Sequence, residues 1–364
     1  MKNNDEIFMK RAVSLARRGA GLVSPNPMVG SVIVRSGKII GEGWHEKFGA
    51  NHAEINAIEN ASGPVKGATL YVTLEPCSHH GKTPPCVGRI INEGLAKVVI
   101  GAGDPNPLVS GRGIKALEKS GVRTSVGVLE SECTELNEKF FKYMRSGMPF
   151  VTLKIAQSLD GRIAASTGDS RWISSTDSRK MAHRERGLHD AVMVGIGTVI
   201  QDDPELTVRL VRGRNPLRVV LDSGLRVPLG ARLLEQSAAK TLVACSRRYD
   251  KVKFAKLRAM GVEVIVSGNE SVDPVKLLRT LAARNISSVL VEGGAGLYTS
   301  FLRANLADRV LAFVAPKIIG KGIEAFGELG TLKIENSRML EIRKLMRRGP
   351  DIVVDARVIK SKGK

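Results

Sequence analysis

The sequence predicts an α/β protein of two domains, each built on a sheet with helices packed against it. Three observations predict this fold. Short buried strand-like runs alternate with helical stretches along the whole chain. The length of 364 residues suggests two or three domains by the usual domain size. A turn-forming break, Ser146-Gly147-Met148-Pro149, separates two such series. We therefore expect domains over residues 1–146 and 150–364.

The hydrophobic pattern predicts the elements of the first domain in order. An amphipathic helix is expected over residues 6–18, followed by a hairpin that turns at Ser36-Gly37 between strands 31–34 and 38–40. Helices are then expected over 52–61, 86–93, 113–120 and 130–145, with strands over 69–74, 97–100 and 122–128. This order predicts a sandwich with helices on both faces of one sheet.

The second domain repeats the alternation with more strands. Buried strand-like runs are expected over residues 150–156, 191–194, 217–221, 241–244, 262–266, 288–291 and 309–314. Helices are expected over 274–283 and 297–304. The last stretch, from residue 338 onward, is rich in lysine and arginine but contains a strand-like run at 352–354, so it is not only a tail.

Composition limits the function classes. The net charge of +20 fits a solvated basic surface, a polyanionic partner or phosphorylated small substrates. Aromatic residues make up only 4% of the chain, which leaves few stacking platforms for single-stranded nucleic acid. Of four cysteines, Cys133 and Cys245 are expected to be buried thiols, a pattern of reducing compartments. With no apolar run long enough to span a bilayer, we expect a cytoplasmic protein without membrane partners.

The motif His52-Ala53-Glu54, followed by Pro76-Cys77 and Cys86, carries the most information. One histidine and two cysteines supply three ligands for Zn²⁺, and three protein ligands leave a fourth position open, which is typical of a catalytic zinc. The H-x-E…P-C arrangement is the signature of zinc deaminases that act on nucleobases. Glu54 is then expected to move protons and to stay off the metal.

The spacing of the cysteines departs from the common P-C-x-x-C pattern. Eight residues separate Cys77 from Cys86. One interpretation is that the two are unrelated core thiols. The other, which we favour, is a substrate-reading loop whose cation is Lys82. Cys86 follows two prolines and opens a predicted helix, whose N-terminus favours a thiolate.

The second domain lacks a complete dinucleotide fingerprint, because the glycine pattern from Gly195 ends in Ile200. The run Glu292-Gly293-Gly294-Ala295-Gly296 lies at a strand-to-helix turn, where backbone N–H groups can approach a phosphate. A plain tight turn explains it as well. The Asp202-Asp203-Pro204 run resembles a metal- or ribose-binding pair, or equally a turn that ends a helix. Basic residues that together suggest a phosphorylated substrate are Lys154, Arg171, Arg184, Arg186 and Arg209.

Long strings of the chain resemble the bacterial bifunctional deaminase–reductases of riboflavin biosynthesis from end to end. In the first domain they are SPNPMVG (24–30), HAE (52–54) and EPCSHHGKTPPC (75–86), which includes the long cysteine gap. In the second they are KIAQSLDGR (154–162), GDSRWI (168–173), GIGT (195–198), DDPELTVR (202–209) and VEGG (291–294).

The resemblance implies two consecutive reactions. A cytidine-deaminase-like three-layer sandwich would deaminate 2,5-diamino-6-(5-phosphoribosylamino)pyrimidin-4(3H)-one with one Zn²⁺ per chain. A dihydrofolate-reductase-like α/β domain would then reduce the ribosyl side chain of the product, 5-amino-6-(5-phosphoribosylamino)uracil, to ribityl with NADPH. Phosphoribosyl-pyrimidines are the partners implied, and nucleic acid is not expected. The family also implies a homo-oligomer, a dimer or a tetramer.

Residue roles carry over by position. His52, Cys77 and Cys86 correspond to the zinc ligands, Glu54 to the proton shuttle, and Lys154 to an electrostatic contributor in the reductase. Positions that match substrate contacts are Asn26, Lys82, Ser170, Arg186, Leu206, Arg209 and Glu292. Positions that match cofactor contacts are Ala156, Trp172, Thr198, Asp202, Ser223, Gly294, Ala295, Gly296, Leu297, Tyr298, Thr299 and Ser300.

Two other functions remain open at this stage. The basic charge and the zinc motif also suit a deaminase of tRNA or another nucleic acid with an appended binding domain. A non-catalytic RNA-binding protein with a structural zinc is the third hypothesis. NADPH binding is expected of the deaminase–reductase and not of the nucleic-acid deaminase. Loss of activity in Glu54→Gln is expected of any deaminase and not of the non-catalytic RNA-binding protein.

Overall fold

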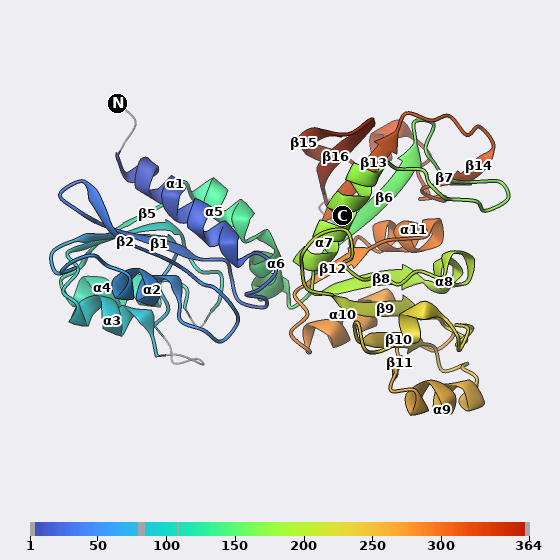
Figure 1. Cartoon of the computed structure of the whole chain (residues 1–364), viewed down its shortest axis with the longest axis horizontal. Coiled ribbons are helices and arrows are strands. Elements are labelled where there is room, and N and C mark those ends of the chain that lie inside the picture. Colours follow the sequence, from blue (N-terminus) through green and yellow to red (C-terminus); the bar gives the residue numbers. More distant parts are fainter. Residues whose placement is uncertain (1–3, 79–83, 108, 361–364) are drawn as a thin grey trace. The chain divides into compact units, whose positions relative to one another are not determined.

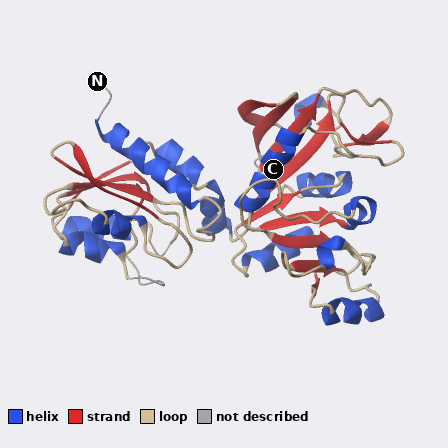
Figure 2. Ribbon diagram, in the orientation of Figure 1, coloured by secondary structure: helices blue, strands red, loops and turns tan. Residues whose placement is uncertain are grey.

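The computed structural model describes residues 4–78, 84–107 and 109–360. The chain folds into two compact units, Met1–Met148 and Pro149–Lys364, which are described separately below. Lys82, the cation of the predicted substrate loop, lies outside the described residues. Both units contain helices and strands, as Figure 2 shows, and the two kinds of element alternate along much of the chain.

The first unit is built on a sheet in the order β2-β1-β3-β4-β5. β1 pairs antiparallel with both β2 and β3, whereas β3, β4 and β5 run parallel. The hairpin between β1 and β2 turns at Ser36 and Gly37, as predicted, and both adopt a positive φ. The strands are β1 Gly30–Arg35, β2 Lys38–Trp44, β3 Thr69–Leu74, β4 Lys97–Ala102 and β5 Arg123–Val126.

Helices cover both faces of this sheet. α1 (Asn4–Ala16) and α5 (Glu130–Leu136) lie on one face, and α2 (Ala53–Glu59), α3 (Cys86–Asn92) and α4 (Arg112–Lys119) lie on the other (Figure 1). Because successive side chains of a strand point to opposite faces, β1 supplies both cores. Val32 and Val34 pack with α1, whereas Ile33 packs with α2 and α3.

Two glycines allow the helices to approach the sheet closely. A Cβ on Gly30 would lie 2.0 Å from the Ala12 carbonyl oxygen of α1. A Cβ on Gly43 would lie 2.4 Å from the Ala53 carbonyl oxygen, at the start of α2. Real Cβ atoms do not come this close to backbone. The position of α2 therefore depends on the absence of a side chain at residue 43.

The helix predicted over residues 130–145 is wrong in one respect, because it is two helices. α5 ends at Leu136 and α6 spans Glu138–Ser146. Asn137 separates them, and its buried side-chain amide binds Met28 twice: Oδ1 accepts from the Met28 N–H at 2.8 Å and Nδ2 donates to its carbonyl at 2.8 Å. A tertiary contact therefore breaks a segment whose local pattern favours one helix.

The second unit is built on a nine-stranded sheet in the order β11-β10-β9-β8-β12-β6-β13-β16-β15. The strands from β11 to β13 are parallel, and β16 and β15 close the sheet as an antiparallel hairpin. The strands are β6 Phe150–Ser158, β8 Ala191–Gly195, β9 Leu217–Leu221, β10 Thr241–Cys245, β11 Glu263–Val266, β12 Ser288–Val291, β13 Arg309–Ala315, β15 Leu340–Arg348 and β16 Asp351–Val358.

Five helices flank this sheet among the described residues: α7 Thr176–Leu188, α8 Ile196–Asp202, α9 Lys251–Ala259, α10 Pro274–Ala282 and α11 Ala295–Arg303. α7 packs through Ala182 against Leu311 and Phe313 of β13. A small two-stranded sheet, β7 (Arg162–Ala165) with β14 (Gly322–Glu324), stands apart from the main sheet. Asp160, in the turn between β6 and β7, accepts hydrogen bonds from the Ile319 and Gly320 backbone N–H groups in the connection between β13 and β14.

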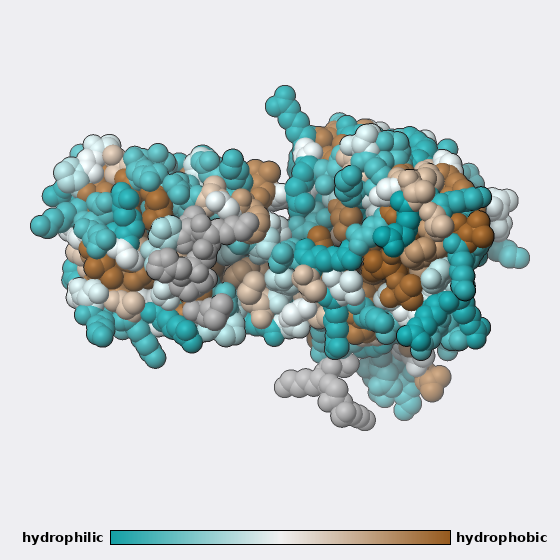
Figure 3. All heavy atoms as spheres, turned by 90° about the horizontal axis from the view of Figure 1, so that it is seen from below, coloured by the Kyte–Doolittle hydropathy of each residue, from teal (hydrophilic) through white to brown (hydrophobic). Residues whose placement is uncertain are grey.

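The surface is mostly polar. On the face drawn in Figure 3, hydrophilic residues surround smaller groups of hydrophobic ones. In the part of the chain that the structure describes, no helix combines the length and the apolar character needed to cross a bilayer.

Candidate functional site

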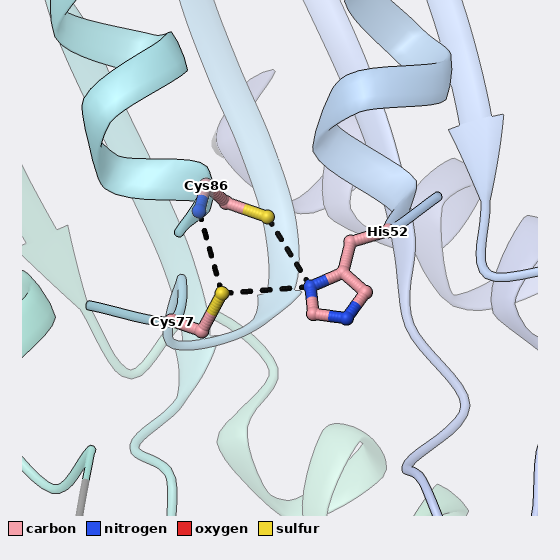
Figure 4. A group of neighbouring side chains, drawn as sticks. All are labelled: His52, Cys77 and Cys86. Carbon is pink, nitrogen blue, oxygen red and sulfur yellow. Dashed lines mark hydrogen bonds between the residues drawn. The ribbon is translucent and has the colours of Figure 1, made fainter. Parts of the chain in front are cut away.

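His52, Cys77 and Cys86 come together in the first unit from three different elements. His52 is the residue just before α2, Cys77 follows the end of β3, and Cys86 is the first residue of α3. The Nδ1 atom of His52 lies 3.5 Å from Cys77 Sγ and 3.3 Å from Cys86 Sγ (Figure 4). All three ligand atoms lie within 4.8 Å of one another.

These separations fit a tetrahedral zinc ion. Bonds of about 2.0 Å to nitrogen and about 2.3 Å to sulfur place the donors of such an ion about 3.5 Å apart. The backbone N–H of Cys86 also donates to Cys77 Sγ over 3.3 Å, a contact that favours the thiolate a metal requires. One nitrogen and two sulfurs therefore form a zinc site whose three protein ligands leave room for a fourth.

Protonation in the site follows from burial and from the contact between the thiols. Their mutual hydrogen bond lowers the pKa of Cys77 and raises that of Cys86, so the pair holds one proton between them in the absence of metal. Glu54, in the first turn of α2, is only 3% exposed. Burial raises the pKa of Glu54, and the His52 imidazole opposes this rise. A buried carboxyl with a raised pKa beside a metal site is suited to carry a proton.

Asn26, a predicted substrate contact, is held by a histidine that the sequence analysis did not identify. Asn26 Nδ2 lies 3.2 Å from His45 Nε2, and His45 Nδ1 lies 3.0 Å from the Asn51 carbonyl oxygen. The His45 ring meets the His52 ring edge-on, with centroids 5.3 Å apart. His45 directly follows β2, and a polar residue at the end of a strand is the signal that sequence reasoning could have used.

Glu75 fixes the loop that carries Cys77. Its buried carboxylate accepts four backbone N–H groups, from Asp104 (3.3 Å), Gly111 (3.0 Å), Gly113 (3.0 Å) and Ile114 (3.3 Å). Glu75 thus joins the end of β3 to the start of α4. Because Glu75 is two residues before Cys77 in the sequence, these contacts also hold the backbone that carries a zinc ligand. Sequence analysis used Glu75 only as part of a matching string.

The second unit contains a cavity of about 1060 Å³ beside the ends of β8 and β12. Most of the predicted reductase residues line it: Lys154, Ala156, Ser170, Trp172, Arg186, Thr198, Asp202, Leu206, Arg209, Glu292, Gly294, Ala295, Gly296, Leu297, Tyr298 and Ser300. Pockets of this size hold cofactors and small substrates. The cavity therefore brings together side chains that are up to 146 residues apart in the sequence, from Lys154 to Ser300.

Two predicted cofactor contacts do not line this cavity. The Ser223 hydroxyl accepts from the Val272 N–H over 3.0 Å. The Thr299 hydroxyl donates to the Ala295 carbonyl and accepts from the Gly327 N–H, and it lines a second hollow of about 670 Å³ behind α11. Both hydroxyls thus make local hydrogen bonds, and their predicted contact with the cofactor stays a prediction.

A buried ion-pair cluster marks one side of the cavity. Arg186 binds Glu292 with both arms, Nε to Oε1 at 2.5 Å and Nη2 to Oε2 at 2.9 Å. Lys154 Nζ lies 3.9 Å from Glu292 Oε2. Burial alone would raise the pKa of Glu292, but the Arg186 guanidinium lowers it to about 2. Burial lowers the pKa of Lys154, and Glu292 opposes that change.

The two glycine turns meet at the cavity. The Gly195 N–H donates to the Gly293 carbonyl over 3.0 Å, so the turn before α8 and the turn before α11 lie side by side. Gly293 adopts a φ of +126°, which a residue with a side chain rarely adopts. A Cβ there would lie 3.4 Å from the Tyr298 hydroxyl. Backbone rather than side chain therefore forms this part of the wall.

Helix α7 lines the cavity with one face. Arg179, Ala182, His183 and Arg186 recur at the spacing of a single helix face, and all four line the cavity. Arg179 lies over the Trp172 ring, 4.2 Å from its centroid. Sequence analysis identified only Arg186 among them. The helix itself was not predicted, and an inward face this polar gives no apolar stripe to detect.

Ser170 and Asp202 lie against each other at the cavity rim. The Ser170 hydroxyl donates to Asp202 Oδ1 over 3.2 Å, and Arg171 Nη2 donates to the Asp202 carbonyl over 3.2 Å. Asp202 is the last residue of α8, so the interpretation as a helix-ending turn describes its backbone. Trp172 is 65% exposed at the rim, unusual for so large an apolar ring.

Comparison with known families assigns each half of the chain. Residues 2–102 match the cytidine and deoxycytidylate deaminase zinc-binding region, and residues 149–354 match the RibD C-terminal domain. The first of these matches covers all three zinc ligands and Glu54, and the second covers the cavity. The two units therefore have a deaminase-like and a reductase-like fold.

Relatives match over nearly the whole chain. The riboflavin biosynthesis protein RibD of Aquifex aeolicus is 46% identical over 96% of this chain and 97% of its own. RibD of Escherichia coli is 38% identical over 96% and 98%. A crystal structure of a diaminohydroxyphosphoribosylaminopyrimidine deaminase/5-amino-6-(5-phosphoribosylamino)uracil reductase from Thermotoga maritima is 42% identical, with a TM-score of 0.86 over 98% of this chain and 99% of that one. RibD of Acinetobacter baumannii gives a TM-score of 0.89 at 37% identity, over 98% and 99%.

Proposed function

The chain belongs to the RibD family of bifunctional riboflavin-biosynthesis deaminase–reductases, and we propose that each unit carries one of the two activities. The first unit deaminates the diaminohydroxyphosphoribosylaminopyrimidine, and the second reduces 5-amino-6-(5-phosphoribosylamino)uracil with NADPH. The observation that carries the proposal is the pairing of a three-ligand zinc site beside a buried carboxyl with a charged cavity in the other unit.

In the deaminase, the protein residues bind the ion and move protons. His52, Cys77 and Cys86 would hold zinc, which when bound would lower the pKa of a coordinated water from about 15.7 to about 7. Glu54 would accept a proton from the attacking water and pass it to the ring nitrogen, and would then carry the remaining hydroxyl proton to the departing amine. Its burial favours the protonated form between these transfers. The amine leaves as ammonia, and the ring gains a carbonyl.

Asn26 is the substrate contact that the described residues support on the deaminase side. Its amide is oriented by His45, whose other ring nitrogen is tied to the backbone of Asn51. An oriented amide can donate and accept at once, which suits the edge of a pyrimidine. Lys82 is proposed as a second contact from the family resemblance alone.

In the reductase, the cavity holds the substrate against the cofactor. NADPH supplies a hydride to C1 of the opened ribose. Arg186, Arg209 and Glu292 are proposed to bind the substrate, and Lys154, which lines the same cavity, is proposed to contribute electrostatically to the reduction. The N-terminus of α11, at Ala295 and Gly296, is proposed as the place for a cofactor phosphate, because both residues line the cavity and the first N–H groups of a helix have no partner within it.

The nucleic-acid deaminase considered from the sequence is the weaker candidate. The relatives match over the second unit as well as the first, and a nucleic-acid deaminase has no need of a reductase-like cavity. We also propose a cytoplasmic homo-oligomer, a dimer or a tetramer, in line with the family resemblance. Sedimentation of the purified protein tests that assembly.

The decisive experiment follows both products by mass. Purified protein is incubated with the diaminopyrimidine substrate, with and without NADPH. We expect the deaminated ribosyl product alone without NADPH, and the ribityl product when NADPH is present. Failure to release ammonia refutes the deaminase, whereas a deaminated product that NADPH leaves unchanged refutes the reductase.

A further inference from the structure

His183 is a buried histidine at the cavity that the reductase chemistry described above does not use. It is 6% exposed and lies on the inward face of α7, one turn before Arg186. Its Nδ1 atom accepts from the Arg209 backbone N–H over 2.9 Å, with the Leu210 N–H further away at 3.4 Å. The imidazole therefore binds backbone of the loop that carries two predicted substrate contacts, Leu206 and Arg209.

That loop, residues 203–216, has no regular secondary structure. It depends on side chains for its shape. Arg186 Nη1 donates to the Thr207 carbonyl over 2.9 Å, and Asn215 Oδ1 accepts from the Val208 N–H over 2.7 Å. His183 adds the tie at Arg209. Two of these three ties come from α7, so the loop and the helix share one face of the cavity.

The ring must be neutral to make this contact. A backbone N–H needs the lone pair of Nδ1, which places the ring proton on Nε2. Arg186 Nη1 lies 3.5 Å from Nε2, a long separation for a hydrogen bond, and that guanidinium nitrogen already donates to Thr207. Burial and the Arg186 charge lower the pKa of His183 to about 4, with Arg209 and Lys154 acting in the same direction and Glu292 against it.

We propose that His183 is a positioning residue of the reductase: its neutral ring ties the 203–216 loop to α7 and so places Leu206 and Arg209 on the substrate side of the cavity. The inference rests on the proposed reductase function. It predicts a specific loss, because an untied loop weakens substrate binding and leaves the cofactor side, at α8 and α11, in place.

Two variants separate the acceptor from the bulk of the ring. His183→Asn keeps an acceptor oxygen where Nδ1 lies, and His183→Leu keeps similar volume without an acceptor. We expect His183→Leu to raise the KM for the deaminated substrate about tenfold, since a buried N–H loses its partner. The KM for NADPH should stay within about twofold. His183→Asn should return the substrate KM to within about threefold of the wild type.

The results distinguish a failure of the positioning role of His183 from a failure of the proposed reductase function. If the wild type does not reduce the substrate, the proposed function fails. If the wild type reduces it and both variants match the wild type, or both lose kcat equally, the positioning role is overturned. Circular dichroism of the same samples, together with the KM for NADPH, reports whether the second unit, which contains His183, has folded. Should His183→Leu not fold, His183→Ala replaces it as the variant without an acceptor. A substrate KM that rises in His183→Ala but not in His183→Asn supports the role, and a KM that rises for NADPH as well refutes it.

Discussion

The two sites of this chain are built in opposite ways. The zinc site gathers three side chains from the start of α2, the start of α3 and the loop after β3, and the bond lengths of one small ion account for their spacing. The reductase cavity distributes many lining residues over about 1060 Å³. Its charged side chains, Lys154, Arg186 and Glu292, shift one another's pKa. A compact site leaves a readable spacing in the sequence, whereas a distributed one leaves scattered residues that only the fold brings together.

Glu54→Gln is the strongest test of this difference, because the compact site has one residue for proton transfer. We expect ammonia release to fall by about 10²–10⁴-fold, the usual contribution of a positioned acid–base. Zinc content should remain one per chain, since Glu54 is proposed to move protons and not to bind the metal. Metal analysis and an ammonia assay measure both quantities.

A matched control lies on the same helix. Glu59→Gln changes the same atoms at an exposed position of α2 and should leave ammonia release unchanged. If Glu54→Gln instead loses zinc, the carboxylate binds the metal and its assigned role is wrong.

Lys154→Ala tests the distributed site. Lys154 is the cation beside Glu292 inside the cavity, and its removal takes charge from the place where the substrate is expected. We expect reduction of the deaminated substrate to slow by about 100-fold, comparable to losing one electrostatic contact of a reacting group. NADPH oxidation followed by absorbance measures it.

Exposed Lys276 on α10 provides the control for that variant. Lys276→Ala should reduce the substrate at the wild-type rate. A wild-type rate in Lys154→Ala as well would exclude the electrostatic role. In that case the reductase cavity would act by binding the substrate and the cofactor, without an electrostatic contribution from Lys154.

Glu292→Gln tests whether the charges of the reductase cavity also stabilise the folded second unit. The folded pKa of Glu292, about 2, is below the ordinary value of 4.5, so its ion pair stabilises the second unit above pH 4.5. That stabilisation is lost as the pH falls from 4.5 towards 2. Removing one partner of a buried pair costs about 3–5 kcal/mol, so the variant should unfold earlier in urea at pH 7.

The pH dependence supplies the check on that result. Between pH 4.5 and pH 2 the wild type should lose the contribution of Glu292, and Glu292→Gln should not. Urea titrations followed by circular dichroism at several pH values compare the two proteins. Parallel acid profiles would show that Arg186 and Glu292 do not stabilise the folded unit as a pair.

Local pattern was enough where an element is buried and continuous. The strands Thr69–Leu74, Leu217–Leu221 and Ser288–Val291 have the bounds that their apolar runs predict. The local sequence pattern did not predict an element correctly where a contact with residues distant in sequence determines its structure. The break at Asn137 depends on Met28, and α7 has a polar inward face because it lines a site.

The same distinction holds for the sites. The zinc ligands could be found because their chemistry limits both residue type and spacing. His45, Glu75 and His183 were not identified as functional, since each acts by holding another residue or a loop. Asn26 is 19 residues from His45, Arg209 is 26 residues from His183, and Ile114 is 39 residues from Glu75, and no short motif records such pairings.

Gly43 has a consequence for genetics. A methyl group at this position would meet backbone of α2 and push the start of that helix, with His52 and Glu54 on it, away from the cysteines. A strain that depends on this protein for riboflavin would then require added riboflavin when it carries Gly43→Ala. The same allele would leave the reductase intact, so it should complement a second allele defective only at Lys154.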